Sequence, residues 1–333
     1  MPASFDGDKP GPAPMRPVNE ARRRRSKLVI WAIVTALFVV CLALGLGLGL
    51  SLRHSSDDGS GSLSSTSPRP TPAAVWQPEP GTTWQIVLNS VLNIDDDNPT
   101  VTPDVAVFDI DMFLHHDSTV IANLHKLGKK VICYFSAGSY EPDRPDSHKF
   151  RAEDLGDELQ GWPGERWLNI SSPSVLSIME ERIELASRMG CDAIDPDNVD
   201  GYQNVNGLDL TSDESITLVS FLVDKANDRN LAVGLKNAFD IIPDVVSIVQ
   251  FAVNEQCAQY KNCGNLKPFI NAKKPVFHIE YPKGAPGKVA AADSDGACNA
   301  RGSTGFSTII KAMNLGGWAE YCDGGTVDTK VFT

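Results

Sequence analysis

Four carboxylates crowd into residues 190–202, which have the sequence Gly-Cys-Asp-Ala-Ile-Asp-Pro-Asp-Asn-Val-Asp-Gly-Tyr. They are Asp192, Asp195, Asp197 and Asp200. The segment begins with apolar residues typical of a buried strand, where an unpaired charge is costly. Acids placed where such a strand meets a loop therefore need a reason. Three candidates are hydrolysis of a sugar bond, metal binding and the local chemistry of a turn.

Hydrolysis of a glycosidic bond needs two carboxyl groups, one to protonate the leaving oxygen and one to attack or to activate water. Asp197 and Glu255 are the candidate pair, because each follows a separate apolar run. Other interpretations stay open for each residue taken alone. Asp-Pro-Asp-Asn is strong turn sequence, and Glu255 stands beside a cysteine-bounded loop.

Metal binding is the weaker interpretation of the four aspartates. Their spacing loosely resembles a calcium loop but lacks the glycine and the distal glutamate of an EF-hand. The six histidines are dispersed, and no Cys/His spacing resembles a zinc site. We therefore predict no metal and no cofactor.

The candidate acids follow short apolar runs that alternate with amphipathic, helix-like stretches. Continuous apolar runs are typical of strands covered on both faces in a parallel sheet. Eight such strands over about 250 residues predict a (β/α)8 TIM barrel, whose active site lies at the C-terminal ends of the strands. By this count Asp197 and Glu255 end the fourth and sixth strands. The runs cover residues 85–89, 105–109, 130–135, 191–195, 231–235, 249–253, 275–279 and 308–312.

A different kind of segment precedes the barrel. Residues 28–52 carry no charge and are long enough to span a bilayer as a helix. Most nearby Lys and Arg residues come before this run, which predicts a cytoplasmic N-terminus and a type II, single-pass protein with an extracellular catalytic domain. The expected organisation is a disordered cytoplasmic tail (1–27), a single transmembrane helix (28–52), a Ser/Pro/Gly-rich stalk (53–75) and the barrel (76–333).

Charge and cysteines support an acidic, extracellular domain. The chain has 42 Asp and Glu against 30 Lys and Arg, and 8 of the basic residues but only 3 of the acidic ones precede residue 54. Such a surface is a poor partner for nucleic acid and attracts cationic ligands. Six of the seven cysteines follow the apolar segment, which indicates disulfides. One pairing joins Cys257 to Cys263 and Cys298 to Cys322, leaving Cys133 and Cys191, although six cysteines allow about 15 connectivities.

Four segments together resemble glycoside hydrolase family 114, the endo-α-1,4-polygalactosaminidases. They are Ile-Asp-Pro-Asp-Asn-Val-Asp-Gly-Tyr (194–202), Val-Ile-Cys-Tyr-Phe-Ser-Ala-Gly-Ser-Tyr-Glu (131–141), Gly-Leu-Lys-Asn (234–237) and Val-Asn-Glu-Gln-Cys (253–257). The resemblance implies a (β/α)8 barrel that cleaves internal α-1,4 links between galactosamine residues of a cationic, partly deacetylated exopolysaccharide. It implies that Asp197 and Glu255 are catalytic. The family motif often has Glu where this chain has Asp195, which makes a substrate contact there less secure.

In this interpretation Asp197 is the nucleophile and Glu255 the general acid/base, with retention and inversion both open. Polar and aromatic residues around the predicted barrel mouth are candidates to bind the sugar. A monomeric ectodomain is expected. The alternatives are a glycan-binding barrel without activity and a glycosidase for another amino-sugar polymer. The candidate substrate-binding residues are Asp109, Asp111, Tyr134, Ser136, Asp195, Asn198, Asp200, Tyr202, Lys236, Asn254, Glu280 and Tyr281.

Overall fold

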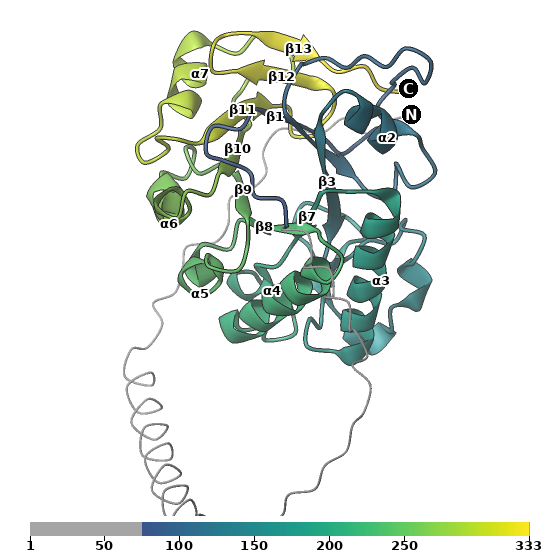
Figure 1. Ribbon diagram of the computed structural model, residues 1–333. Helices are drawn as coiled ribbons and strands as arrows, with labels where there is room; N and C mark the ends of the chain where they lie inside the picture. Colours follow the sequence, from purple (N-terminus) through teal and green to yellow (C-terminus); the bar gives the residue numbers. More distant parts are fainter. Residues whose placement is uncertain (1–74, 333) are drawn as a thin grey trace, which may run out of the picture. The chain divides into compact units, whose positions relative to one another are not determined.

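A curled, mostly parallel sheet carries helices on its outer face in the computed structural model, which describes residues 75–332 (Figure 1). Eight of its strands are parallel and neighbour one another in chain order. Each of the eight apolar runs overlaps one of these strands. They are β1 (Trp84–Val87), β2 (Val107–Asp111), β3 (Lys130–Ser136), β7 (Ala193–Asp197), β8 (Ala232–Lys236), β9 (Phe251–Glu255), β10 (Val276–Glu280) and β11 (Ser307–Lys311).

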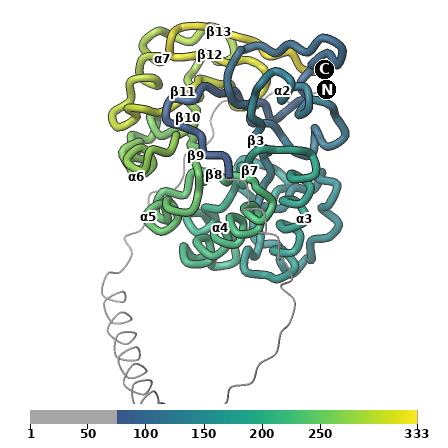
Figure 2. The backbone as a smooth tube through the Cα atoms, viewed as in Figure 1, coloured from purple at the N-terminus to yellow at the C-terminus, as the bar shows by residue number. Residues whose placement is uncertain are grey.

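The two ends of this parallel series meet through side chains and through a C-terminal hairpin. The hairpin consists of β12 (Trp318–Tyr321) and β13 (Thr326–Asp328), and β12 pairs antiparallel with β11. The indole Nε1 of Trp84 donates to the carbonyl of Ser307 at 2.8 Å, and Lys311 Nζ donates to Gln85 Oε1 at 2.9 Å. Figure 1 accordingly shows β1 beside β11, and Figure 2 shows β7, β8, β9, β10 and β11 following one another around the curled sheet. The curled sheet is therefore consistent with a TIM-like barrel.

The helices depart from the expected regular alternation. Among the described residues, the connection from β1 to β2 contains no helix, and the β12–β13 hairpin follows β11 where an eighth helix was expected. A small antiparallel sheet is inserted after β3, formed by β4 (Ser139–Tyr140), β5 (Leu155–Glu158) and β6 (Arg166–Leu168). The helices are α2 (Val120–Lys126), α3 (Pro173–Met189), α4 (Ser212–Asn227), α5 (Ile242–Val245), α6 (Lys267–Asn271) and α7 (Ala291–Cys298).

The two longest helices begin and end where their sequences indicate. In α3, Pro173 occupies the first turn, and Gly190 ends the helix with a left-handed φ of 89°. In α4, Thr211 and Glu214 form a capping box, as the Thr-Ser-Asp-Glu sequence predicts. A cap of this kind stabilises a helix by about 1 kcal/mol.

Side-chain alternation along the strands decides which residues point into the curled sheet. Successive side chains of a strand point to opposite faces. One apolar cluster fills the inside, and it includes Val107 of β2, Ala193 of β7, Ala232 of β8 and Phe251 of β9. A second, larger cluster lies between the strands and the helices. Within a strand, a residue two or four positions away from a member of the inner cluster therefore also points inward.

Three disulfides join the six cysteines of the described part, in the predicted pairing: Cys133–Cys191, Cys257–Cys263 and Cys298–Cys322. No helix within residues 75–332 is long and apolar enough to cross a membrane. The predicted membrane segment, 28–52, lies outside the described residues, as do the predicted tail and nearly all of the stalk.

Candidate active site

Charged residues end six of the parallel strands, all at the same edge of the sheet. They are Asp111 (β2), Asp197 (β7), Lys236 (β8), Glu255 (β9), Glu280 (β10) and Lys311 (β11). By alternation the first four point inward, whereas Glu280 points outward. In parallel-strand order, Asp197 and Glu255 end the fourth and sixth strands, as predicted, and Lys236 ends the strand between them.

Lys236 joins the two predicted catalytic carboxylates. Its Nζ lies 3.2 Å from Oδ2 of Asp197 and 3.3 Å from Oε2 of Glu255. The lysine side chain is buried, whereas about a fifth of each carboxylate side chain is exposed. A buried ammonium is stable only when it is paired, and here two carboxylates pair with it. The three side chains form a charged centre at the mouth of the curled sheet.

Two tyrosines add one hydrogen bond to each carboxylate. The hydroxyl of Tyr134 donates to Oδ2 of Asp197 at 3.0 Å, and the hydroxyl of Tyr281 donates to Oε1 of Glu255. Burial and the nearby carboxylates raise the pKa of both tyrosines well above the usual value. Both hydroxyls therefore remain protonated donors and fix the orientation of the carboxylates.

The electrostatic balance at Glu255 has opposing contributions. Burial raises its pKa, but the charge of Lys236 and the hydrogen bonds from Tyr281, Lys236 and Asn237 outweigh burial, so the pKa of Glu255 is lowered. Burial lowers the pKa of Lys236, but the charges of Asp197 and Glu255 raise it by more. The pKa of Lys236 therefore lies well above its usual value. The resting site thus holds an ammonium ion beside an ionised Glu255.

The backbone turns sharply directly after each of these three charged residues. Asn198, Asn237 and Gln256 have left-handed φ values of 61°, 52° and 62°. The turns also place polar groups near the centre: the amide of Asn198 donates to Oδ1 of Asp197 at 2.7 Å, and Asn237 Oδ1 accepts the amide of Glu255 at 3.0 Å. Left-handed residues other than glycine cost free energy and cluster at functional sites.

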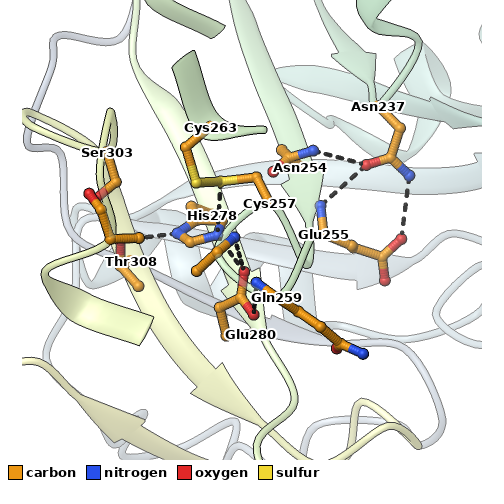
Figure 3. Close-up of a disulfide and its surroundings, with 12 residues drawn as sticks. Asn237, Asn254, Glu255, Cys257, Gln259, Cys263, His278, Glu280, Ser303 and Thr308 are labelled. Carbon is orange, nitrogen blue, oxygen red and sulfur yellow. Dashed lines mark hydrogen bonds and ion pairs between the residues drawn. A yellow bond between two sulfur atoms is a disulfide. The ribbon is translucent and has the colours of Figure 1, made fainter. Parts of the chain in front are cut away.

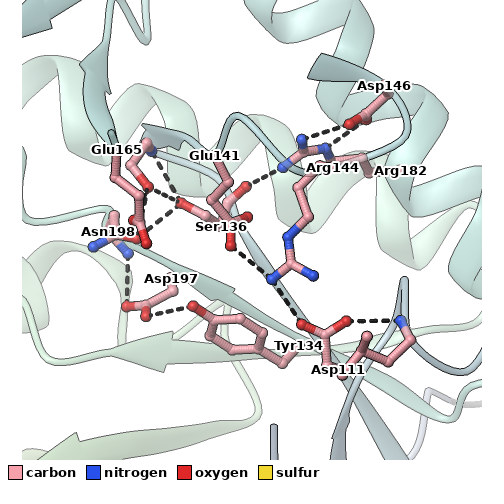
Figure 4. A network of polar contacts seen from close by, with 12 residues as sticks. Asp111, Tyr134, Ser136, Glu141, Arg144, Asp146, Glu165, Arg182, Asp197 and Asn198 are labelled. Carbon is pink, nitrogen blue, oxygen red and sulfur yellow. Dashed lines mark hydrogen bonds and ion pairs between the residues drawn. The ribbon is translucent and has the colours of Figure 1, made fainter. Parts of the chain in front are cut away.

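One wall of the mouth is built from the insertion after β3 (Figure 4). Arg144 bridges Oδ2 of Asp111 at 2.7 Å and Oε1 of Glu141 at 2.6 Å. Ser136 Oγ donates to Asn198 Oδ1 at 2.8 Å, which ties β3 to the turn after Asp197. Burial, followed by the charges of Glu141 and Asp197, raises the pKa of Glu165 to about 7.

The sequence prediction missed three residues of this wall. Glu141 ends one of the motifs quoted above, which was the available signal for it. Arg144 and Glu165 lie in irregular sequence of the insertion, where no periodicity or motif marks them.

Asp200 and Tyr202 belong to the loop after β7. Asp200 is half-buried, and burial together with the charge of Asp197 raises its pKa to about 7. The hydroxyl of Tyr202 accepts a hydrogen bond from Gln203 Nε2 at 3.0 Å. Asp200 is therefore within electrostatic range of the charged centre, whereas Tyr202 contacts Gln203 of its own loop and Asp240 of the loop after β8.

Two of the residues predicted to bind substrate, Glu280 and Asn254, lie on the outer side of the strands (Figure 3). Glu280 Oε1 contacts Nε2 of His278 at 2.8 Å and accepts the amide of Ala258 at 2.7 Å. Asn254 Nδ2 donates to Asn237 Oδ1 at 3.1 Å. Glu280 and Asn254 thus hold the loops that follow β9 and β8, and neither points into the mouth.

Two further residues predicted to bind substrate, Asp109 and Asp195, point inward but have no exposed surface. Each lies one inward position below a residue of the mouth, Asp109 below Asp111 and Asp195 below Asp197. Asp192 lies at the other end of β7, where its Oδ1 pairs with Lys130 at 2.6 Å and its Oδ2 contacts His125 at 2.9 Å. The acids of residues 190–202 are therefore divided between the mouth, the interior and the opposite end of the strand.

Within residues 75–332, the one group of His, Cys, Asp and Glu close enough together to share a metal ion is Cys257, Cys263 and His278. Its two sulfur atoms are joined in a disulfide, so it offers no thiolate. The geometry supplies instead two carboxylates at the mouth of a barrel-like sheet, and this is the arrangement of a glycoside hydrolase.

Residues 65–327 match the model of glycoside-hydrolase family GH114. The chain belongs to this family, and it is a glycoside hydrolase. The crystal structure of Ega3 from Aspergillus fumigatus in complex with galactosamine is 52% identical to it, with a TM-score of 0.70, and the match covers 75% of this chain and 98% of that one.

A more distant likeness concerns the fold alone. A variant of the glycoside hydrolase domain of PelA from Pseudomonas aeruginosa is 12% identical, with a TM-score of 0.50, covering 70% of this chain and 95% of that one. No curated protein matches the chain.

Proposed function

We propose that this enzyme cleaves internal α-1,4 linkages of a cationic, partly deacetylated galactosamine polymer. The proposed scaffold is a (β/α)8-type barrel that has no helix between β1 and β2 in its described part and a hairpin in place of the eighth helix. The observation that carries the proposal is the pair Asp197 and Glu255, held on either side of Lys236 at the ends of the fourth and sixth parallel strands. The GH114 match and the similarity to a galactosamine-bound Ega3 support the choice of sugar.

In the proposed reaction, Asp197 is the nucleophile and Glu255 is the general acid and base. Glu255 protonates the leaving oxygen while Asp197 attacks the anomeric carbon, and water then hydrolyses the glycosyl ester with Glu255 as base. Because each facing oxygen lies within 3.3 Å of the same Lys236 nitrogen, the two oxygens are at most about 6.5 Å apart. This limit favours retention, for which the carboxyl groups are about 5–5.5 Å apart.

The protonation of Glu255 has a consequence for the working pH. A general acid must carry its proton before the leaving group departs. Since Lys236 and its hydrogen-bond donors lower the pKa of Glu255 in the resting site, the protonated form is favoured at acidic pH. The substrate amines also stay cationic there, so acidic conditions suit both the acid catalyst and charge pairing with the polymer.

Acidic side chains around the centre support a cationic substrate. Asp111 and Glu141 share Arg144, whereas Glu165 and Asp200 have pKa values raised to about 7 through burial and neighbouring carboxylates. An incoming ammonium group would stabilise the ionised form of either raised carboxyl, because an opposite charge nearby favours ionisation. We infer that Glu165 and Asp200 pair with the amines of bound galactosamine.

We also propose that residues 28–52 anchor the enzyme in the cell membrane as a type II, single-pass protein. The support is the uncharged length of this segment and the basic residues before it. The stalk, residues 53–75, would then keep a monomeric catalytic domain outside the cell, close to extracellular polysaccharide.

Two variants test the reaction directly. Asp197→Asn and Glu255→Gln should each lower kcat on partly deacetylated galactosamine polymer by about 10²–10⁴-fold or more, whereas Glu184→Gln, in an exposed ion pair with Arg188, should have no effect. Persistent cleavage by both variants would refute the assignment. Binding without cleavage by the wild type would instead indicate a glycan-binding protein.

Substrate and stereochemistry need separate assays. Galactosamine and glucosamine oligomers of equal length should be compared side by side, and faster cleavage of the glucosamine series would refute the proposed sugar. NMR of the first product formed gives the anomeric configuration, and an inverted product would show that Asp197 acts as a base and not as a nucleophile.

A further inference from the structure

Two buried carboxyl groups below the active site have no role in the reaction as proposed. Asp109 and Asp195 are both 0% exposed. Among the residues that the structure describes, no donor reaches any of their four carboxyl oxygens. Unpartnered carboxylates in a buried interior are strongly destabilising, so their arrangement needs an explanation.

The two carboxyl groups lie close enough together for one to donate to the other when it is protonated. A carboxylate oxygen only accepts hydrogen bonds, so two ionised groups cannot bond to each other. A proton on one of the two supplies the donor that these buried oxygens otherwise lack. We propose that Asp109 and Asp195 share a single proton and together form a positioning pair, which holds Lys236 between Asp197 and Glu255 by supplying one negative charge from below.

The surroundings of the pair agree with one proton and one charge. Burial and the charge of Asp195 raise the pKa of Asp109 well above its usual range, which makes Asp109 the donor. Burial also raises the pKa of Asp195, to about 7, against the lowering effects of Lys236 and of the hydrogen bond from Asp109. Asp197 and Glu255 face the pair as further negative charges.

The charge of the pair reaches the reaction through Lys236. Asp195 follows Asp197 and Glu255 among the charges that raise the pKa of Lys236, although it is not in ion-pair contact with it. Asp195 thus attracts the ammonium group toward the floor of the mouth, while the two upper carboxylates attract it from the sides. This role rests on the proposed function, because it matters only if Asp197 and Glu255 are catalytic.

The shared proton can be detected without any substrate. At about pH 8, where groups with a pKa near 7 such as Glu165 and Asp200 are mostly ionised, the infrared spectrum of the wild type should show a protonated carboxyl band. The band should disappear in Asp109→Asn and also in Asp195→Asn, because each amide donates to the remaining carboxylate. It should persist in Asp154→Asn, a control at another buried aspartate, which accepts from Ser174.

Absence of the band from the wild type at this pH, or its persistence in both variants, would overturn the proposal. The wild-type spectrum decides the matter even where a variant fails to fold. Failure to cleave galactosamine polymer would refute the proposed function and leave this spectroscopic result unaffected.

Kinetics then test the positioning role. Asp109→Asn keeps a donor and the charge on Asp195, so its kcat should fall less than that of a variant that removes the charge. Asp154→Asn, at a buried aspartate outside the site, should keep the wild-type kcat and pH profile. The double variant Asp109→Asn/Asp195→Asn loses the charge, and kcat should fall by about 10²-fold as Lys236 shifts, with a changed pH profile. A double variant with wild-type kcat and pH profile would refute the positioning role.

Discussion

Replacing Lys236 with methionine removes the cation between Asp197 and Glu255 while keeping most of the side-chain volume. The two facing oxygens lie 3.2 Å and 3.3 Å from Nζ in the intact site. At 3.3 Å and an effective dielectric constant of about 20, the ammonium of Lys236 and the carboxylate of Glu255 attract by about 5 kcal/mol. Since one pKa unit corresponds to about 1.4 kcal/mol, loss of this attraction is worth about three pKa units or slightly more.

The direction of the change follows from the intact site. Lys236 lowers the pKa of Glu255, so its removal must raise that pKa, and Glu255 will then hold its proton to higher pH. The alkaline limb of the kcat/KM profile, which reports the general acid, should move up by about three pH units. Misplacement of the carboxylates should also lower the maximal kcat by about 10²-fold.

The assay is the initial rate of cleavage of a defined galactosamine oligomer, measured from about pH 4 to about pH 9. Lys225→Met is the matched control, because Lys225 pairs with Glu180 on the helical surface at 2.9 Å. Its profile should coincide with that of the wild type. An alkaline limb of Lys236→Met that stays within about half a pH unit of the wild type would refute the electrostatic reasoning.

Three further predictions concern other parts of the domain. Tyr281→Phe removes a hydrogen bond to Glu255 and should lower kcat about tenfold, and an unchanged kcat would show that this bond is not needed. Trp162, 48% exposed in the insertion after β3, should contact sugars far from the cleaved bond. Trp162→Ala should therefore raise KM about fivefold for long polymer but not for short oligomers, whereas an equal effect on both would exclude this role. Replacing Cys133 and Cys191 together by Ala should lower the free energy of unfolding in urea by about 4 kcal/mol, because this disulfide closes a separation of 58 residues; a loss below about 1 kcal/mol would contradict the loop-entropy argument.

The strands were predictable because continuous apolar runs mark parallel strands, and Asp197 and Glu255 were predicted to end the fourth and sixth of them. The apolar runs themselves, 191–195 and 249–253, stop two residues before those strand ends. The structure includes both acids as the last residues of β7 and β9. Near the mouth the inside of the curled sheet is polar, so the apolar pattern stops before the backbone pairing does.

The catalytic candidates could be predicted from a motif and from strand order. Predicting their neighbours in the site also requires knowing which side chains of each strand point inward. Glu280 and Tyr281 are adjacent in sequence, yet only Tyr281 contacts the charged centre. A strand that is apolar on both faces does not reveal which face turns inward. The shared proton of Asp109 and Asp195 could not be foreseen for the same reason, because it depends on two side chains meeting inside the sheet.

The left-handed turns after Asp197, Lys236 and Glu255 have a consequence for protein engineering. The sheet's own hydrogen bonds position these three residues, and the chain changes direction one residue later, so the following loops begin outside the strands that hold the charged centre. Loops can therefore be exchanged to accept other sugars while the chemistry is kept. The graft should begin after Asn198, Asn237 and Gln256, and glycine is the replacement that these three positions accept without strain.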